Sequence, residues 1–140
     1  NSIHVKGPEK IKSIRNISTK EYPGFPTDLA PQFMVLLCKA SGTSSITENI
    51  FQGRFLHAME LQRLGAKITI KNRTAKIEGN KNFIAAEVMS SDLRASAALV
   101  LAGIVSKGKT IVTRVYHCDR GYENFENKLK KIGVKIKRLR

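Results

Sequence analysis

Two related stretches of the sequence decide the fold. The first reads TDLAPQFMVLLCKASGTSSITENIFQGRFLHAMELQRLGAKI at residues 27–68, and the second runs from SDLRASAALVLAG at residue 91 to IGVKI at residue 136. Matching residues lie 64 positions apart at Asp28 and Asp92 and 68 positions apart at Gly65 and Gly133, a drift that short loop insertions produce. The sequence therefore predicts a duplicated supersecondary unit, with copies at about residues 22–80 and 86–140.

Apolar periodicity and turn residues predict the same order of helix, strand, helix and strand in both units. The expected helices are 27–40, 55–64, 91–105 and 122–132, and the expected strands are 45–48, 67–71, 74–78, 86–89, 110–115 and 135–139. Residues 1–20 alternate as a strand-like leader. Thr27 and Ser91 are predicted N-caps, and Gly65 and Gly133 are predicted to end the second helix of each unit. The fold class is therefore mixed α/β (α+β).

The composition excludes several classes of protein. Hydrophobic residues make up 41% of 140 residues, which is enough for a buried core and excludes disorder throughout. The longest apolar runs, 33–38 and 95–105, are too short to cross a bilayer. Two cysteines, Cys38 and Cys118, make neither a disulfide framework nor a set of metal ligands, so we expect a reducing, cytoplasmic compartment. The chain shows no basic-then-apolar leader and begins with Asn1, which predicts a processed or cut chain.

The chain is strongly basic, with 25 Lys and Arg against 11 Asp and Glu and a formal net charge of +14. The one dense basic run, residues 128–140, is interleaved with apolar residues, as in a helix followed by a half-buried strand whose charges face solvent. A nucleic-acid patch is the alternative, although six Phe, three Tyr and no Trp offer few stacking platforms. An anionic small molecule remains a further option.

A rigid turn, YPGFPTD at residues 22–28, delivers Asp28 to the start of a helix. Its two prolines fix φ, and its glycine permits a tight bend. Asp28 is then either a carboxylate that the helix dipole stabilises or a group aimed at a ligand hydroxyl as acceptor or general base. The second unit repeats this acid as Asp92.

Two arginines, Arg94 and Arg120, are expected at helix N-termini, where the helix dipole disfavours a cation. A bound anion would explain both positions, since guanidinium groups hold carboxylate and phosphate in bidentate fashion. His57 and His117 lack neighbours at metal-ligand spacing, so we expect no metal site. Cys118 beside His117 is either a nucleophile or, as we favour, a plain buried thiol.

Four motifs carry a family resemblance. They are YPGFPTD at 22–28, ITENIF with RFLH at 46–57, SDLRAS with LVLAG at 91–103, and YHCDRGY at 116–122. In order and spacing they resemble the bacterial UDP-N-acetylglucosamine enolpyruvyl transferases over nearly the whole chain from Tyr22. The resemblance implies transfer of enolpyruvyl from phosphoenolpyruvate to the 3-hydroxyl of the sugar, the first committed step of peptidoglycan synthesis. It implies no cofactor, no metal, no nucleic acid and no membrane.

The resemblance also implies a fold and roles for site residues. The family fold is an inside-out α/β barrel with three βαβαββ-like repeats per domain, so residues 1–140 would be one partial domain with two repeats, inactive without the rest of the polypeptide. Asp28 would bind the amino sugar and act on its hydroxyl, and Ile50 would contact the UDP-sugar through its backbone. Arg94 and Arg120 would hold phosphoenolpyruvate, with Arg120 also catalytic, and Asp92 would support them.

Missing motifs and a related enzyme family leave alternatives to this assignment open. The family's reactive-cysteine loop and its Lys-Asn pair have no counterpart in this sequence, and neither Cys38 nor Cys118 occupies the motif of that cysteine. The related shikimate 3-phosphate enolpyruvyl transferases share the fold and comparable Asp and Arg positions, although the ITENIF and YHCDRGY segments favour the nucleotide-sugar enzymes. A basic nucleic-acid-binding module is the alternative from another class.

Overall fold

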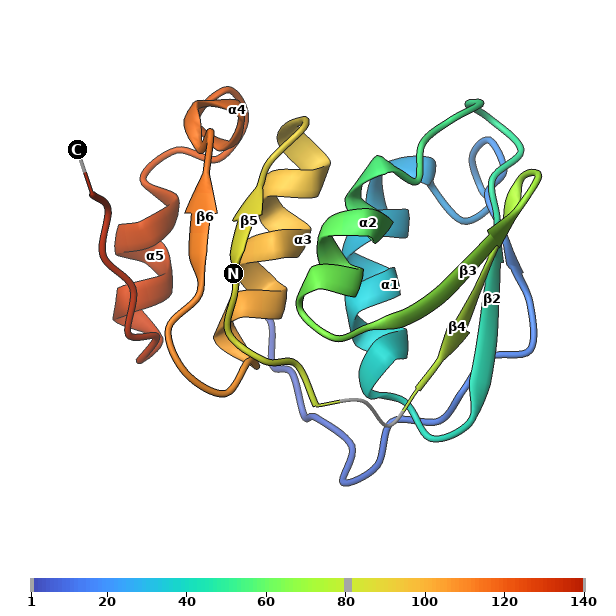
Figure 1. Cartoon of the computed structure of the whole chain (residues 1–140), viewed down its shortest axis with the longest axis horizontal. Helices are drawn as coiled ribbons and strands as arrows, with labels where there is room; N and C mark the ends of the chain where they lie inside the picture. Colours follow the sequence, from blue (N-terminus) through green and yellow to red (C-terminus); the bar gives the residue numbers. More distant parts are fainter. Residues whose placement is uncertain (1, 80–81, 140) are drawn as a thin grey trace.

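The computed structural model describes residues 2–79 and 82–139. Three helices lie side by side, with a four-stranded sheet on one side and a two-stranded sheet on the other (Figure 1). The elements of the first stretch are β1 (Ile17–Ser18), η1 (Thr27–Leu29), α1 (Ala30–Lys39), β2 (Thr43–Thr47), α2 (Leu56–Arg63), β3 (Lys67–Lys71) and β4 (Thr74–Glu78). Those of the second are β5 (Glu87–Met89), α3 (Leu93–Ile104), β6 (Ile111–Thr113), α4 (Tyr116–Asp119) and α5 (Phe125–Lys131). The mixed α/β class predicted from the sequence is confirmed.

The two sheets differ in their pairing. The larger sheet has the order β1-β2-β4-β3, in which β1 is parallel to β2 and β4 is antiparallel to both of its neighbours. The smaller sheet pairs β5 and β6 in parallel, with Val88 opposite Val112. In both stretches a helix comes before a strand of the sheet that it covers: α1 precedes β2, and α3 precedes β6.

The core lies where α1, α2 and α3 meet. Helix α3 presents small residues to its neighbours, and Ala95, Ala98 and Ala102 are fully buried together with Leu99. Alanines allow helices to approach closely, so α3 can contact both α1 and α2. The expectation that α3 is buried on most sides is only partly right, because Leu101, Ile104 and Val105 at its end are 36–45% exposed.

The start of each first helix differs from the expectation. Asp92, not Ser91, caps α3, because its carboxylate Oδ1 accepts hydrogen bonds from the backbone amides of Arg94 and Ala95. Thr27 does not cap a helix but begins a 3-10 turn, since its hydroxyl donates to the buried carboxylate of Glu48 instead. Tertiary partners therefore override the local capping preference at Thr27.

The C-terminal region also differs from the expectation. Residues 116–119 form the short helix α4, and α5 begins at Phe125 rather than at residue 122. Residues 135–139, expected as a strand, are not in one. The equivalent strand of the first stretch, β3, pairs along its length with β4, whereas residues 135–139 pair with no strand in the described part of the chain. A strand without a hydrogen-bonded neighbour is not stable, so the apolar alternation of these residues is not enough to make one.

The leader is shorter as a strand than expected. Only Ile17–Ser18 pair with β2, and Lys12 makes one isolated bridge to Ser41. Residues 2–10 are exposed, so no buried apolar face holds them in a strand.

Candidate functional site

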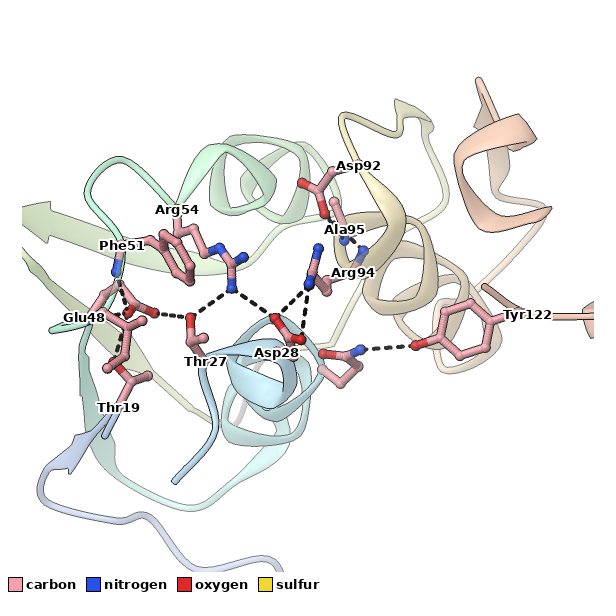
Figure 2. Close-up of polar contacts among 12 residues, drawn as sticks. Thr19, Thr27, Asp28, Glu48, Phe51, Arg54, Asp92, Arg94, Ala95 and Tyr122 are labelled. Atoms are coloured by element: carbon pink, nitrogen blue, oxygen red, sulfur yellow. Dashed lines mark hydrogen bonds and ion pairs between the residues drawn. The ribbon is translucent and has the colours of Figure 1, made fainter. Parts of the chain in front are cut away.

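The Asp28 carboxylate joins the two repeated stretches. It lies in η1, just before α1, and its Oδ1 and Oδ2 accept hydrogen bonds from Nε (2.7 Å) and Nη2 (3.0 Å) of Arg94 in the first turn of α3. A second guanidinium, that of Arg54, donates from Nη1 to Asp28 Oδ1 at 3.0 Å. Figure 2 shows the carboxylate between the two arginines. Its side chain is 56% exposed, so a ligand in solvent can reach it.

The two arginines fix the charge of Asp28. Hydrogen bonding by Arg94 is the main effect on the pKa of Asp28 and lowers it; partial burial opposes this, and hydrogen bonding by Arg54 adds to the lowering, so that the pKa is lowered overall. Asp28 is therefore ionised at neutral pH. A carboxylate paired in this way is a weak base until a ligand draws an arginine away from it.

Arg94 opens α3 as expected, but its neighbourhood already contains negative charge. Asp28 pairs with its side chain, and Asp92 accepts from its backbone amide at 2.8 Å. An anion is thus not required to explain a cation at this helix start, and the role of Arg94 in binding one stays a prediction. Burial raises the pKa of Asp92, but hydrogen bonds from the amides of Ala95 and Arg94 outweigh it, so this carboxylate is also ionised.

Ile50 lies in the loop that follows β2 and is half-buried. Its backbone amide donates to Oε1 of Glu48 at 2.8 Å. The Ile50 amide is therefore engaged within the loop, and a UDP-sugar contact through the Ile50 backbone stays a prediction.

Arg120 is not at a helix N-terminus, which corrects the expectation. It is the exposed C-cap residue of α4, and the next helix begins at Phe125. The glycine after it, Gly121, lies so close to α3 that a Cβ there would stand 2.9 Å from Leu93 Cδ2. This close packing places the Arg120 turn beside Leu93 at the start of α3.

Asp28, Arg54 and Arg94 form one group of ion-paired side chains, called here the Asp28 cluster, and the structure does not bring Arg120 into it. In the described part of the chain Arg120 has no hydrogen-bonded or ion-paired partner. The neighbouring Asp119 pairs with Arg138 at 2.6 and 2.9 Å, so it is not the partner of Arg120. Arg138 also binds Glu126 at 3.0 Å, so part of the basic C-terminal run is neutralised within the chain.

Three polar residues of the site, Thr27, Glu48 and Arg54, were given no site role from the sequence. Arg54 contacts both Asp28 and Thr27, and Glu48 accepts the Thr27 hydroxyl at 2.7 Å. One signal was present for Arg54, which occupies the position 66 residues before Arg120 and so matches it in the repeat. Nothing in the local sequence marks Glu48 and Thr27 as partners, because they lie in separate loops.

Among the described residues, the histidine and cysteine side chains form neither a group of metal ligands nor a reactive thiol. Among residues 2–79 and 82–139, no group of three or more His, Cys, Asp and Glu side chains could hold a metal ion. Burial raises the pKa of Cys38 to about 12 and also raises that of Cys118. Both are buried thiols without thiolate character, as expected for Cys118.

His57 makes folding stability depend on pH. Its side chain is 3% exposed, and burial lowers its pKa from 6.5 to about 4, against a small opposing effect of Asp92. The unfolded chain therefore binds a proton more readily than the folded chain between these values, and stability falls as the pH is lowered. We expect a loss of about 2 kcal/mol between pH 7.5 and 5, measured by urea unfolding.

The control for this prediction is His57→Gln, which removes the titrating group. Carboxylates with lowered pKa values, such as Asp28 and Glu48, lose their stabilising effect only at lower pH and do not enter this window. An equally steep loss between pH 7.5 and 5 in the Gln variant would show that His57 is not its cause.

Comparison with protein families gives a match over most of the chain. The family model described as EPSP synthase (3-phosphoshikimate 1-carboxyvinyltransferase) matches residues 1–129. The chain belongs to this family. Within it, the sequence is 58% identical over 139 residues to the UDP-N-acetylglucosamine 1-carboxyvinyltransferase of Pelagibacter ubique and 55% identical over 139 residues to the UDP-N-acetylglucosamine 1-carboxyvinyltransferase 1 of Clostridium perfringens. These matches cover 99% of this chain but 33% of each relative, so the chain spans about a third of the length of the curated relatives it matches.

Solved structures agree with the family assignment. The enolpyruvyl transferase NikO from Streptomyces tendae superposes with a TM-score of 0.85 at 26% identity, covering 93% of this chain and 30% of NikO. An EPSP synthase from Acinetobacter baumannii gives a TM-score of 0.65 at 17% identity, covering 96% of this chain and 30% of that structure, which shows a shared fold alone. The enolpyruvyl-transferase fold predicted from the motifs is therefore confirmed. No helix in the described residues is long and apolar enough to span a membrane.

Proposed function

We propose that this chain is part of an enzyme that transfers the enolpyruvyl group of phosphoenolpyruvate to the 3-hydroxyl of UDP-N-acetylglucosamine. The observation that carries the proposal is the 58% identity, over 99% of the chain, to a relative named for this sugar nucleotide. Below, "the full-length protein" means the longer polypeptide in which we propose that residues 1–140 form part of one domain. Its place would be the cytoplasm, in peptidoglycan synthesis, with consequences for cell shape and cell division.

The Asp28 cluster supports a role in proton transfer. In the proposed reaction Asp28 takes the proton of the sugar hydroxyl as its oxygen attacks the enolpyruvyl group, and phosphate leaves. The anionic groups of phosphoenolpyruvate compete with Asp28 for Arg94, and this competition frees a carboxylate oxygen for the hydroxyl. When phosphoenolpyruvate draws Arg94 away, Asp28 regains the basicity that its pairing with the arginines suppresses.

The other site residues take the roles that their positions allow. Arg120, exposed and beside the start of α3, holds phosphoenolpyruvate together with Arg94. The Ile50 backbone contacts the UDP-sugar. Asp92 supports Arg94 by fixing its backbone at the first turn of α3. The remaining part of the full-length protein supplies the other wall of the site, and no cofactor or metal is needed.

The second candidate acceptor is shikimate 3-phosphate, because the family model carries the name of that enzyme. Steady-state phosphate release with phosphoenolpyruvate and each acceptor distinguishes the two. We expect the full-length protein to prefer the nucleotide sugar by about 10²-fold or more in kcat/KM, since a site built to hydrogen-bond one acceptor rejects another. A preference for shikimate 3-phosphate would overturn the proposed function.

The 140-residue chain by itself should release no phosphate in the same assay. Half of a site cannot exclude water or supply the preorganised charge on which most of the rate depends. Turnover by the short chain comparable to that of the full-length protein would contradict this.

A further inference from the structure

Glu48 is a buried acid that the proposed mechanism does not use. It follows β2 directly, and it is only 2% exposed. Its Oε1 accepts hydrogen bonds from the Thr19 hydroxyl at 2.8 Å and from the backbone amides of Ile50 and Phe51 at 2.8 and 3.1 Å. Its Oε2 accepts from the Thr27 hydroxyl at 2.7 Å. A buried carboxylate with four donors is a fixed point of the structure.

Two of these four donors lead to Arg54. Thr27 Oγ1 accepts a hydrogen bond from Arg54 Nη1 at 2.8 Å, and the guanidinium carbon of Arg54 lies 4.2 Å from the centre of the Phe51 ring. Figure 2 shows Glu48 between Thr27 and Phe51, with Arg54 leading on to Asp28. Both contacts of the Arg54 guanidinium, its hydrogen bond to Thr27 and its stacking on the Phe51 ring, thus depend on the Glu48 carboxylate.

The single proton of the Thr27 hydroxyl gives this arrangement a direction. An ionised carboxylate only accepts, so the Thr27 proton points to Glu48 and the Thr27 oxygen is left to accept from Arg54. Burial raises the pKa of Glu48, but hydrogen bonds from the two threonines and the two amides outweigh it, so the pKa is lowered and the group is ionised.

We propose that Glu48 is a positioning residue that orients Arg54, and through Arg54 the Asp28 carboxylate, by holding Thr27 as an acceptor and Phe51 as a stacking surface. The hydrogen bonds from the Ile50 and Phe51 amides to Glu48 also hold the loop that we expect to contact the UDP-sugar. Glu48 therefore positions both this loop and Asp28, the proposed base. The effect on turnover rests on the proposed function, whereas the effect on Arg54 does not.

The variant Glu48→Gln tests the direction of the hydrogen bonds with little change of shape. The amide oxygen of Gln can replace Oε1 and accept from Thr19 and the two backbone amides. Its NH₂ then faces Thr27 and donates to it, so the Thr27 oxygen must accept from both residue 48 and Arg54, and the Thr27 proton loses its acceptor. The hydrogen bond from Arg54 to Thr27 is therefore weakened, while the loop contacts stay in place.

Thr19→Val is the matched control. It removes one donor to the same carboxylate and the acceptor for the Asn49 amide, but Thr19 does not touch Arg54. It should lower the melting temperature at least as much as Glu48→Gln and leave kcat unchanged. Thr27→Val, which removes the acceptor itself, tests the same connection if the Gln variant does not fold.

Three measurements on the full-length protein decide the proposal. For Glu48→Gln we expect kcat to fall about 10–10²-fold with a smaller change in KM, because misplacement of an oriented group acts mainly on the rate. We expect faster hydrogen exchange of the Arg54 guanidinium by ¹⁵N-arginine NMR, and no further loss of kcat when Thr27→Val is added. Unchanged kcat, or an equal loss in Thr19→Val, would reduce Glu48 to a structural role. If the wild-type protein shows no turnover with either acceptor, the proposed function fails, and unaltered Arg54 exchange in Glu48→Gln would still overturn the positioning role separately.

Discussion

Replacing Asp28 with asparagine should lower kcat of the full-length protein by about 10²–10⁴-fold, with a much smaller change in KM for the nucleotide sugar. The amide has the shape of the carboxylate, and its oxygen can still accept from Arg94 or Arg54. It is, however, a very poor base, so the loss falls on proton transfer. Steady-state kinetics at saturating phosphoenolpyruvate measure this directly.

The competing explanation is that Asp28 only ties the two repeats together. The Asp28 side chain is 56% exposed, and solvent-exposed ion pairs contribute about 0–1 kcal/mol each, so their loss should shift the melting temperature by only a few degrees. Glu126→Gln is the matched control, because Glu126 makes a similar two-point contact to Arg138, at 3.0 and 3.2 Å, away from Asp28. A variant Asp28→Asn with normal kcat and a melting shift like that of Glu126→Gln would establish the structural explanation.

Local sequence signals made most of the fold predictable. Apolar periodicity, prolines and glycines act over a few residues, so the four helical segments and the strands 67–71 and 74–78 could be placed closely from the sequence. The positive φ of Gly65 (93°) and Gly133 (92°) shows why glycine stands just after α2 and α5.

The errors occurred where distant partners decide the local structure. Thr27 reads as a helix cap but donates to Glu48, which is 21 residues away. Residues 135–139 have the apolar alternation of a strand but no paired neighbour. The Asp28–Arg94 pair spans 66 residues, and no local pattern states that α1 and α3 begin side by side. The family resemblance named both residues separately, whereas their contact, and the part of Arg54 in it, came from the packing of three helices.

Replacing Arg120 with lysine should lower kcat/KM for phosphoenolpyruvate by about 10–150-fold and leave the Kd for the UDP-sugar nearly unchanged. Lysine keeps the charge but loses the planar fork, and a one-point contact in place of a two-point contact costs about 1.5–3 kcal/mol. The structure favours this result over a purely structural role for Arg120, because its nearest acid in sequence, Asp119, is engaged by Arg138.

The setting of Arg120 makes the test selective. Gly121 packs against Leu93, so the turn is held beside α3 whichever cation it carries, and the exposed side chain itself has little to do with folding. Arg63→Lys provides the control, since Arg63 is exposed on α2 with a loose 3.8 Å contact to Glu60 and should leave both kinetics and binding unchanged. The measurements are kcat/KM for phosphoenolpyruvate and calorimetric Kd for the UDP-sugar. If kcat/KM stays at the wild-type value, or if both quantities fall together, Arg120 does not hold the anion, and Arg94 must bind it without a second arginine from this chain's α4 turn.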